Sequence, residues 1–203
     1  WSSDVCSSDL FTTKAENEVS WYQNEPKTSV QLIQSCKVAK DANIIDIGGG
    51  DSYLIDSLLD LGYTNLFLLD ISAAAIERAK KRLGDQAKNV TFIVSDSLYF
   101  QSDEKFEVWH DRASFHFFTE ANDIEQYKNN VIANTNQNAH FIIGTFSEEG
   151  PLKCSGLPIT QYSIQTMEAV FGNDFELENC FTEDHETPFD TVQNFIFCHY
   201  MKK

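Results

Sequence analysis

The chain has 203 residues, of which 42% are hydrophobic and 23% charged. This composition is typical of a folded globular protein and excludes a disordered or fibrous one. Acidic residues number 31 against 15 basic ones, and the resulting net charge of -16 repels nucleic acid and anionic lipid. The apolar runs are strand-sized, so we expect no membrane-spanning segment.

Five cysteines occur without a CxxC pair and without a Cys/His spacing typical of metal sites. The number is odd in a chain of moderate length, and no secretory signal is visible at the amino end. We therefore expect a reducing, cytoplasmic setting and no metal site.

The first ten residues, WSSDVCSSDL, repeat SSD and show neither helical nor strand periodicity. They resemble a translated adapter sequence, with a natural disordered tail as the alternative. Both interpretations remove Trp1 and Cys6 from functional consideration and leave residues 11–203 as a single domain.

From residue 43 onward, predicted strands alternate with predicted helices. A helical region at 11–41 comes first, and strands follow at 43–47, 65–70, 89–96, 105–111 and 139–146. Helices are predicted at 52–63, 71–84, 123–135 and 163–172, with Ser72 as a helix cap. Alternation of this kind indicates an α/β fold with a parallel sheet. The last two strands, at 175–183 and 191–201, are joined too closely to be parallel, so the sheet ends in a hairpin.

A glycine turn follows the first strand, in the order Asp46, Gly48, Gly49, Gly50. Ligands of open parallel sheets bind beyond the carboxyl ends of the strands, at this position. Asp70 ends the second strand, where a carboxylate can accept both ribose hydroxyls of a nucleoside.

Two cofactor classes compete for this turn. The dinucleotide motif GxGxxG requires a glycine at position 53, where the chain has Tyr53. A pyrophosphate would also lie near Asp46, and two like charges about 4 Å apart cost on the order of 4 kcal/mol. Carboxylates at Asp46 and Asp51 favour a cationic cofactor without phosphate, such as S-adenosylmethionine. A structural turn that binds no ligand is the alternative.

With these features, residues 11–203 resemble the class I S-adenosylmethionine-dependent methyltransferases. The segment WHDRASFHF at 109–117, with EVSWYQ at 18–23, is similar to a group of small bacterial-type methyltransferases of poorly defined substrate. The resemblance implies a Rossmann-like sheet of seven strands in the order 3-2-1-4-5-7-6, with strand seven antiparallel and helices on both faces. The family's Asp/Glu-x-Gly-x-Gly-x-Gly motif matches Asp46, Gly48 and Gly50, but Ser52 replaces its last glycine.

The resemblance also implies which residues bind the cofactor. Asp70 would hold the ribose, Asp96 the adenine amino group, and the backbone near Asp111 would line the methionine portion. Asp96 has a turn-capping role as its alternative. The full expected set is Asp46, Gly48, Gly49, Gly50, Asp70, Ile71, Asp96, Ser97, Asp111 and Trp21.

Methyl transfer from a sulfonium has a neutral leaving group, so alignment of donor and acceptor can suffice. A general base is needed only for a protonated nucleophile, and His110 and His116 are the candidates. For His116 the alternative is a buried, hydrogen-bonded histidine. Arg112 either pairs with Asp111 or binds an acidic substrate.

We expect the acceptor pocket between three segments: Trp21 and Tyr22, the segment 109–117, and the loop 147–158, which is a candidate lid. Cys154 in that loop is assigned no chemical role. The aromatic pair has helix packing as its alternative.

The sequence thus predicts a cytoplasmic methyltransferase acting on a small molecule, with a protein side chain as the second choice of acceptor. An NAD(P)-dependent oxidoreductase and a non-catalytic cofactor-binding module of the same fold are the alternatives.

Overall fold

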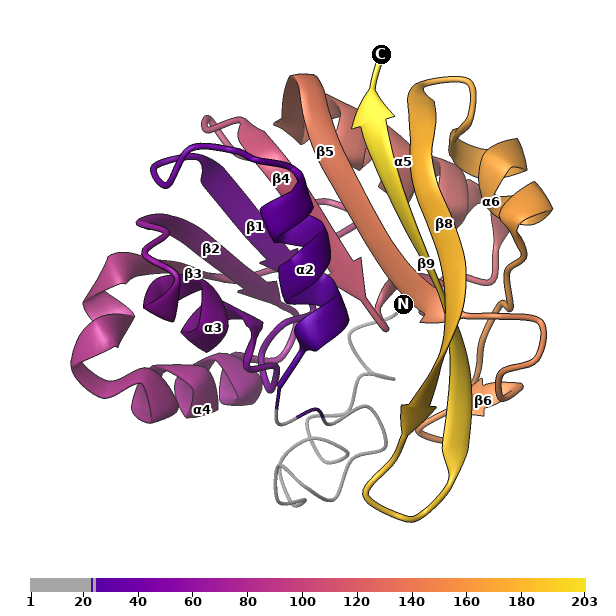
Figure 1. Ribbon diagram of the computed structural model, residues 1–203, viewed down its shortest axis with the longest axis horizontal. Coiled ribbons are helices and arrows are strands. Elements are labelled where there is room, and N and C mark those ends of the chain that lie inside the picture. The colour runs from indigo at the N-terminus through magenta and orange to yellow at the C-terminus, as the bar shows by residue number, and fades with distance from the viewer. Residues whose placement is uncertain (1–22, 24) are drawn as a thin grey trace.

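A computed structural model describes Gln23 and residues 25–203, and its centre is a seven-stranded sheet (Figure 1). The strands run in the order β3-β2-β1-β4-β5-β9-β8, all parallel except β9, which is antiparallel to both neighbours. Their bounds are β1 Asn43–Ile47, β2 Asn65–Asp70, β3 Val90–Val94, β4 Phe106–Arg112, β5 Thr135–Phe146, β8 Phe175–Glu186 and β9 Val192–Lys202. The labels β6 (Lys153–Cys154) and β7 (Leu157–Pro158) belong to a separate two-residue pair. The predicted order 3-2-1-4-5-7-6 is therefore confirmed for the strands of the main sheet.

Helices cover both faces of the sheet (Figure 1). On one face lie α2 (Lys27–Ser35), α3 (Leu54–Asp60) and α4 (Ala73–Leu83), whose apolar residues share a core with Ile44 and Ile142 of the sheet. On the other face α5 (Ala121–Asn134) and α6 (Ile164–Phe171) share a core with Ile45 and Phe141. Two short 3-10 helices, η2 (Gly84–Asn89) and η3 (Phe115–Phe117), complete the elements of the described residues. Neighbouring strand residues thus enter opposite cores, as the pleat requires.

The helix predicted for residues 11–41 is wrong in its carboxyl-terminal part. Within the described residues α2 ends at Ser35, where the amides of Cys36 and Lys37 bond three residues back and Lys37 turns to a φ of 55°. A tightened last turn followed by a left-handed residue ends a helix. The α4 cap at Ser72 is confirmed, because its side chain accepts a bond from the Ala75 amide.

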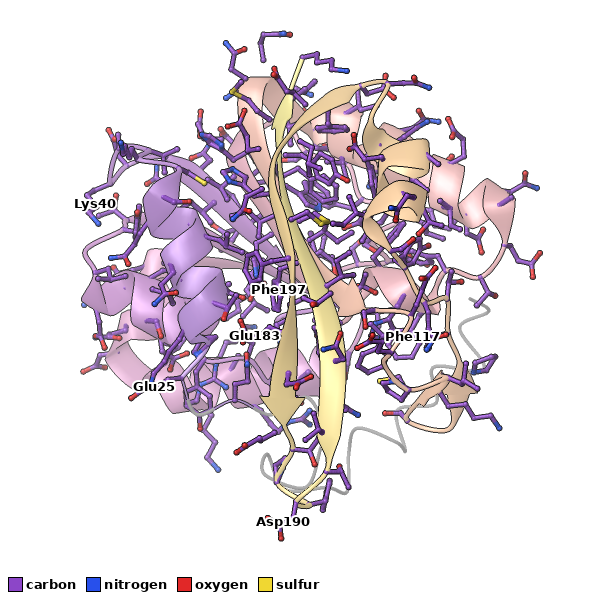
Figure 2. The ribbon with its side chains drawn as sticks, turned by 45° about the vertical axis from the view of Figure 1, so that its right-hand side comes forward. Glu25, Lys40, Phe117, Glu183, Asp190 and Phe197 are labelled. Atoms are coloured by element: carbon purple, nitrogen blue, oxygen red, sulfur yellow. A yellow bond between two sulfur atoms is a disulfide. The ribbon has the colours of Figure 1, made fainter. Side chains whose placement is uncertain are left out.

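The β8–β9 hairpin extends past the sheet, and Figure 2 shows Asp190 at its tip. Thr28 of α2 donates a 2.6 Å hydrogen bond to Glu183 of β8, so the hairpin also contacts the amino end of α2. A disulfide joins Cys180 and Cys198, which are directly opposite each other on the two strands. The cysteine spacing in the sequence did not indicate this pair.

A buried hydrogen-bonded chain fixes the loop after β4. Trp109 Nε1 donates to Tyr127 Oη at 3.1 Å, and that hydroxyl donates to Asp111 Oδ2 at 2.6 Å. Asp111 Oδ1 accepts from the amides of Ser114 and Phe115. Burial raises the pKa of Asp111 to about 6, although these bonds oppose the rise. The Asp111 carboxylate therefore attaches the loop after β4 to the core.

We expect Tyr127→Phe to lower the free energy of unfolding by about 1–3 kcal/mol, because two buried polar groups lose their shared partner. Urea unfolding at neutral pH measures the change. Tyr99→Phe, at a side chain that is 70% exposed, is the control and should change stability little. Equal stability of the Tyr127→Phe variant and the wild type would show that this chain does not stabilise the loop.

Candidate functional site

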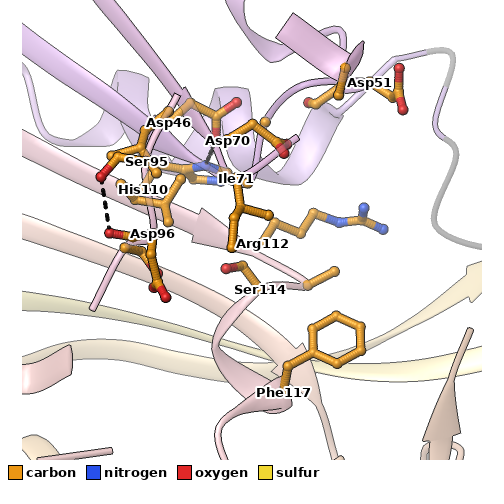
Figure 3. A pocket seen from close by; sticks show the side chains of 18 of the residues that line it. Asp46, Asp51, Asp70, Ile71, Ser95, Asp96, His110, Arg112, Ser114 and Phe117 are labelled. Atoms are coloured by element: carbon orange, nitrogen blue, oxygen red, sulfur yellow. Dashed lines mark hydrogen bonds and ion pairs between the residues drawn. The ribbon is translucent and has the colours of Figure 1, made fainter. Parts of the chain in front are cut away.

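A cavity opens at the carboxyl ends of β1, β2, β3 and β4 (Figure 3). This is the position expected for ligands of an open parallel sheet. The residues that line it include Gln23, Asp46, Gly48, Gly49, Asp51, Asp70, Ile71, Ser95, Asp96, Ser97, His110, Arg112, Ala113, Ser114 and Phe117.

The glycine turn is shaped by the carboxylates beside it. Gly48 has a φ of +68° and its amide bonds the carbonyl of Leu69, which ties the turn to β2. A Cβ added to Gly49 would lie 2.1 Å from Asp46 Oδ2, and one added to Gly50 would lie 2.8 Å from Asp70 Oδ2. Only glycine allows the backbone to approach both carboxylates this closely.

Asp46 is 2% exposed and is held by a neighbouring strand. Its Oδ1 lies 2.7 Å from His110 Nδ1, and His110 Nε2 lies 2.9 Å from the hydroxyl of Ser29 in α2. Within the described part of the chain, no donor reaches Asp46 Oδ2. A buried carboxylate oxygen needs a donor, so this atom is suited to a ligand with N–H groups.

Asp70, at the end of β2, accepts bonds from the Gly50 amide at 3.0 Å and from the Ser72 amide at 2.7 Å. Burial raises its pKa to about 6, against the opposing effect of these amides. A carboxylate has about four acceptor positions, so two remain for hydroxyl groups of a ligand.

Asp51 does not supply the charge predicted for it. Its two oxygens form a bidentate ion pair with Arg78 of α4, at 2.8 and 2.7 Å. The guanidinium neutralises this carboxylate, so a cationic ligand gains little from it. The prediction could not anticipate the pair, because the two residues are 27 positions apart.

At the end of β3, Asp96 and Ser97 line the cavity, together with Ile71 from the loop after β2. Asp96 Oδ1 also accepts a 2.9 Å bond from the Leu98 amide, which is the turn-capping role named as its alternative. Figure 3 places Asp96 and the Arg112 guanidinium at opposite ends of the drawn pocket. The cavity therefore has one end at β3 and another at the loop after β4.

Three of the predicted site residues in the described part of the chain do not line this cavity, and the first is Gly50, whose amide bonds Asp70. The Asp111 side chain is buried in the chain that bonds Tyr127, although its neighbours His110 and Arg112 do line it. His116 is fully buried and its ring stacks on Phe146 at 4.5 Å. Burial, with a smaller effect of Arg112, lowers the pKa of His116 to about 3, so the ring is neutral at pH 7. The alternative of a buried histidine is confirmed in its burial, but within the described residues neither ring nitrogen has the hydrogen bond that this alternative expected.

Arg112 points to the opposite side of β4 from Asp111, as successive strand residues do. Its guanidinium lies 4.7 Å from the centre of the Phe195 ring, and Glu183 is among the groups that interact with its charge. Burial lowers the pKa of Arg112 to about 10, and it stays cationic at pH 7. Of the two alternatives for Arg112, the pair with Asp111 is not formed, and the guanidinium contacts an aromatic ring at the cavity wall.

Of the other expected acceptor segments, only the loop 147–158 belongs to the described residues. Trp21 and Tyr22 lie outside the described residues, and no residue of the loop 147–158 lines the cavity. Cys154 is 3% exposed, and burial raises its pKa to about 11, in agreement with a thiol that has no chemical role. Ser29, Ser114 and Phe117 were not predicted, because a single serine or phenylalanine has no sequence pattern that marks a site.

The sequence matches a family described as "Methyltransferase domain" over residues 39–193. This match covers more than half of the chain, and the protein belongs to that family. No helix within residues 25–203 is long and apolar enough to cross a membrane.

One curated relative is the malonyl-[acyl-carrier protein] O-methyltransferase 1 of Ilyobacter polytropus, 34% identical over 77 residues. That match covers 37% of this chain and only 28% of the relative's length.

Two solved structures share the fold. A chain from work on conversion of a disulfide bond into a thioacetal group during echinomycin biosynthesis has a TM-score of 0.78 and 17% identity, over 97% of this chain and 91% of that one. The 1,6-didemethyltoxoflavin-N1-methyltransferase of Burkholderia thailandensis, with bound 1,6-didemethyltoxoflavin and S-adenosylhomocysteine, has a TM-score of 0.69 and 14% identity, over 96% and 81%.

We expect Gly49→Ala to destabilise the fold by about 1–3 kcal/mol, because its Cβ would overlap the Asp46 carboxylate. The same substitution in an Asp46→Ala background should cost less, since the overlapping atoms are gone. A double-mutant cycle by urea unfolding measures this coupling. An equal cost in both backgrounds would mean that the Asp46 side chain does not dictate glycine at position 49.

Proposed function

We propose that this protein transfers a methyl group from S-adenosylmethionine to a small molecule. The observation that carries the proposal is the Asp46 carboxylate, with one oxygen held by His110 and the other reached by no donor of the described residues. Membership of the methyltransferase-domain family supports the reaction class.

The residues of the cavity fit S-adenosylmethionine in their chemical groups and in the order in which those groups follow one another along the cavity. Its ammonium group matches Asp46 Oδ2, and its two ribose hydroxyls match the remaining acceptor positions of Asp70. Asp96 and Ser97 at the other end of the cavity suit the adenine ring. Because Gly49 has no side chain, the methionine portion of the cofactor could approach the backbone there. The Burkholderia methyltransferase, which shares the fold, is described with S-adenosylhomocysteine bound.

A nicotinamide dinucleotide fits these residues poorly. Its pyrophosphate would lie beside the Asp46 carboxylate, where like charges repel. The position of the third motif glycine is occupied by Tyr53, whose ring lies 4.4 Å from the Arg82 guanidinium. Arg82 also donates to the Ser52 carbonyl at 2.6 Å, so this turn is built for packing between α3 and α4.

The chain contributes mainly by positioning the reactants. When bound, S-adenosylmethionine supplies a methyl group on a sulfonium, for in-line displacement by the acceptor. His110 is a positioning residue, because its two ring nitrogens hold Asp46 and Ser29. His110 lines the cavity, but both of its ring nitrogens are already bonded. His116 does not line the cavity, so neither predicted base is placed to accept a proton there. Alignment alone can lower a barrier by roughly 7–11 kcal/mol.

The acceptor belongs at the end of the cavity formed by Arg112, Ser114 and Phe117. The cationic Arg112 and the aromatic ring of Phe117 favour a small, partly apolar acceptor that carries an anionic group. Such an acceptor, for example a carboxylate, arrives deprotonated and needs no general base.

Thermal unfolding tests the cofactor. S-adenosylmethionine and S-adenosylhomocysteine should raise the melting temperature, whereas NADH and NADPH should not, because a ligand of the native state stabilises by mass action. Release of S-adenosylhomocysteine from a panel of carboxylates, amines and thiols then tests the acceptor, and the carboxylates should react best. Stabilisation by a dinucleotide alone would overturn the proposed function.

The pH dependence of cofactor binding tests the role of Asp70. Ribose hydroxyls donate to the ionised carboxylate, whose pKa in the free protein is about 6. Affinity should therefore fall as pH drops through 6, and calorimetry with S-adenosylhomocysteine should show roughly tenfold weaker binding at pH 5 than at pH 7.5.

In the Asp70→Asn variant this dependence should disappear, along with part of the affinity at pH 7.5. Its melting temperature reports whether the Gly50 and Ser72 amides still hold the turn. A wild-type affinity that does not change between pH 5 and pH 7.5 would contradict the proposed contact.

A further inference from the structure

A thiol and two imidazoles from three separate elements meet away from the cavity. They are Cys36 at the end of α2, His140 in β5 and His199 in β9. Cys36 Sγ lies 3.6 Å from His199 Nε2, and His140 Nδ1 lies 2.9 Å from the same nitrogen. The three ligand atoms all lie within 4.8 Å of one another.

The strand register explains why the two histidines meet. His140 is paired with Met201 and His199 with Ile142, so both side chains are on the same face as Ile142 and are diagonal neighbours. That face is the one covered by α2 (Figure 1). On β4, His140 is level with Val108, whereas the cavity begins at His110. The cluster is therefore distinct from the proposed cofactor site.

Two of the three distances between the ligand atoms are close to those around a tetrahedral zinc ion, and the third, between Cys36 Sγ and His140 Nδ1, is within 4.8 Å. Zn–S bonds of about 2.3 Å and Zn–N bonds of about 2.0–2.1 Å place a sulfur and a nitrogen ligand about 3.6 Å apart, and two nitrogens about 3.3 Å apart. The sulfur–nitrogen distance already has this value, and the two imidazoles need to separate by only about 0.4 Å. A hydrogen bond between two ring nitrogens also requires one of them to be unprotonated, and such a nitrogen is a metal ligand.

We propose that Cys36, His140 and His199 bind one Zn²⁺ ion, with water as the fourth ligand. A mixed sulfur and nitrogen set of this kind is the usual choice of zinc, and three protein ligands leave one position open. Glu178, at the β8 position where the pairing with β9 shifts register, adds a negative charge that acts on His140. On binding, the Cys36 S–H bond breaks and the proton goes to solvent, while zinc releases all of its waters except one and gains the sulfur and the two nitrogens as ligands.

Zinc at this position would attach the end of α2 to two strands. The same helix carries Ser29, which contacts His110 beside Asp46. Without metal, the thiol donates to the Leu32 carbonyl at 3.2 Å and the histidines bond each other, so the cluster also has an ordinary structural interpretation. Metal binding distinguishes the two.

The test uses untagged, metal-free protein titrated with Co²⁺, a spectroscopic substitute for zinc. One equivalent should produce a thiolate-to-cobalt charge-transfer band and the visible bands of tetrahedral cobalt, and Zn²⁺ should abolish both. Cys36→Ser should remove the charge-transfer band and weaken Zn²⁺ binding at least ~10-fold, and His140→Gln should weaken it similarly. Cys154→Ser and Cys6→Ser are matched controls and should bind as the wild type does.

Zn²⁺ should also raise the melting temperature of the wild type and of both controls, but not of Cys36→Ser. Circular dichroism shows whether Cys36→Ser folds, and His140→Gln keeps the test valid if it does not. The proposal is overturned if the wild type takes up no stoichiometric metal, if folded Cys36→Ser binds it with wild-type affinity, or if a control variant loses the cobalt spectrum.

Discussion

A carboxylate removed from water needs donors for both of its oxygens, and Asp46, near the end of β1, has a partner among the described residues for only one of them. Its Oδ1 is bonded to His110 of the neighbouring strand, and through that ring to Ser29 of α2. The position of Asp46 Oδ2 excludes a Cβ at residue 49. One charged group thus fixes the residue type in the turn, the orientation of a histidine and the place of a helix.

Successive side chains of β4 point to opposite faces of the sheet, so some of them support the core and the others line the cavity. Trp109 and Asp111 face the core with Tyr127, where their bonds hold the loop that follows. His110 and Arg112 face the other way and line the cavity. Over residues 109–112, alternate residues therefore line the cavity and those between them face the core, whereas Ala113 and Ser114 of the following loop both line the cavity. This division accounts for the burial of the Asp111 side chain.

Local patterns were enough to predict the sheet and the turn. The strand and helix periodicities, the short connection before β9 and the glycines after β1 each act over a few residues. The strand order was implied by the family resemblance alone, and the structure confirms it. Interactions between distant residues could not be predicted in this way. The Asp51–Arg78 pair, the Ser29–His110 contact and the Cys36–His199 contact join residues 27, 81 and 163 positions apart. Each depends on how helices lie on the sheet, which no spacing in the sequence records.

The central claim is that Asp46 recognises the ammonium group of the cofactor. The most direct measurement compares calorimetric affinities for S-adenosylhomocysteine and for 5′-methylthioadenosine, which lacks the amino-acid portion, in the wild type and in Asp46→Asn. A charge-assisted hydrogen bond of about 1.5–3 kcal/mol predicts that the variant loses roughly 10- to 100-fold in its preference for S-adenosylhomocysteine, while its affinity for 5′-methylthioadenosine changes little. A folded variant that kept the full wild-type preference would contradict the account.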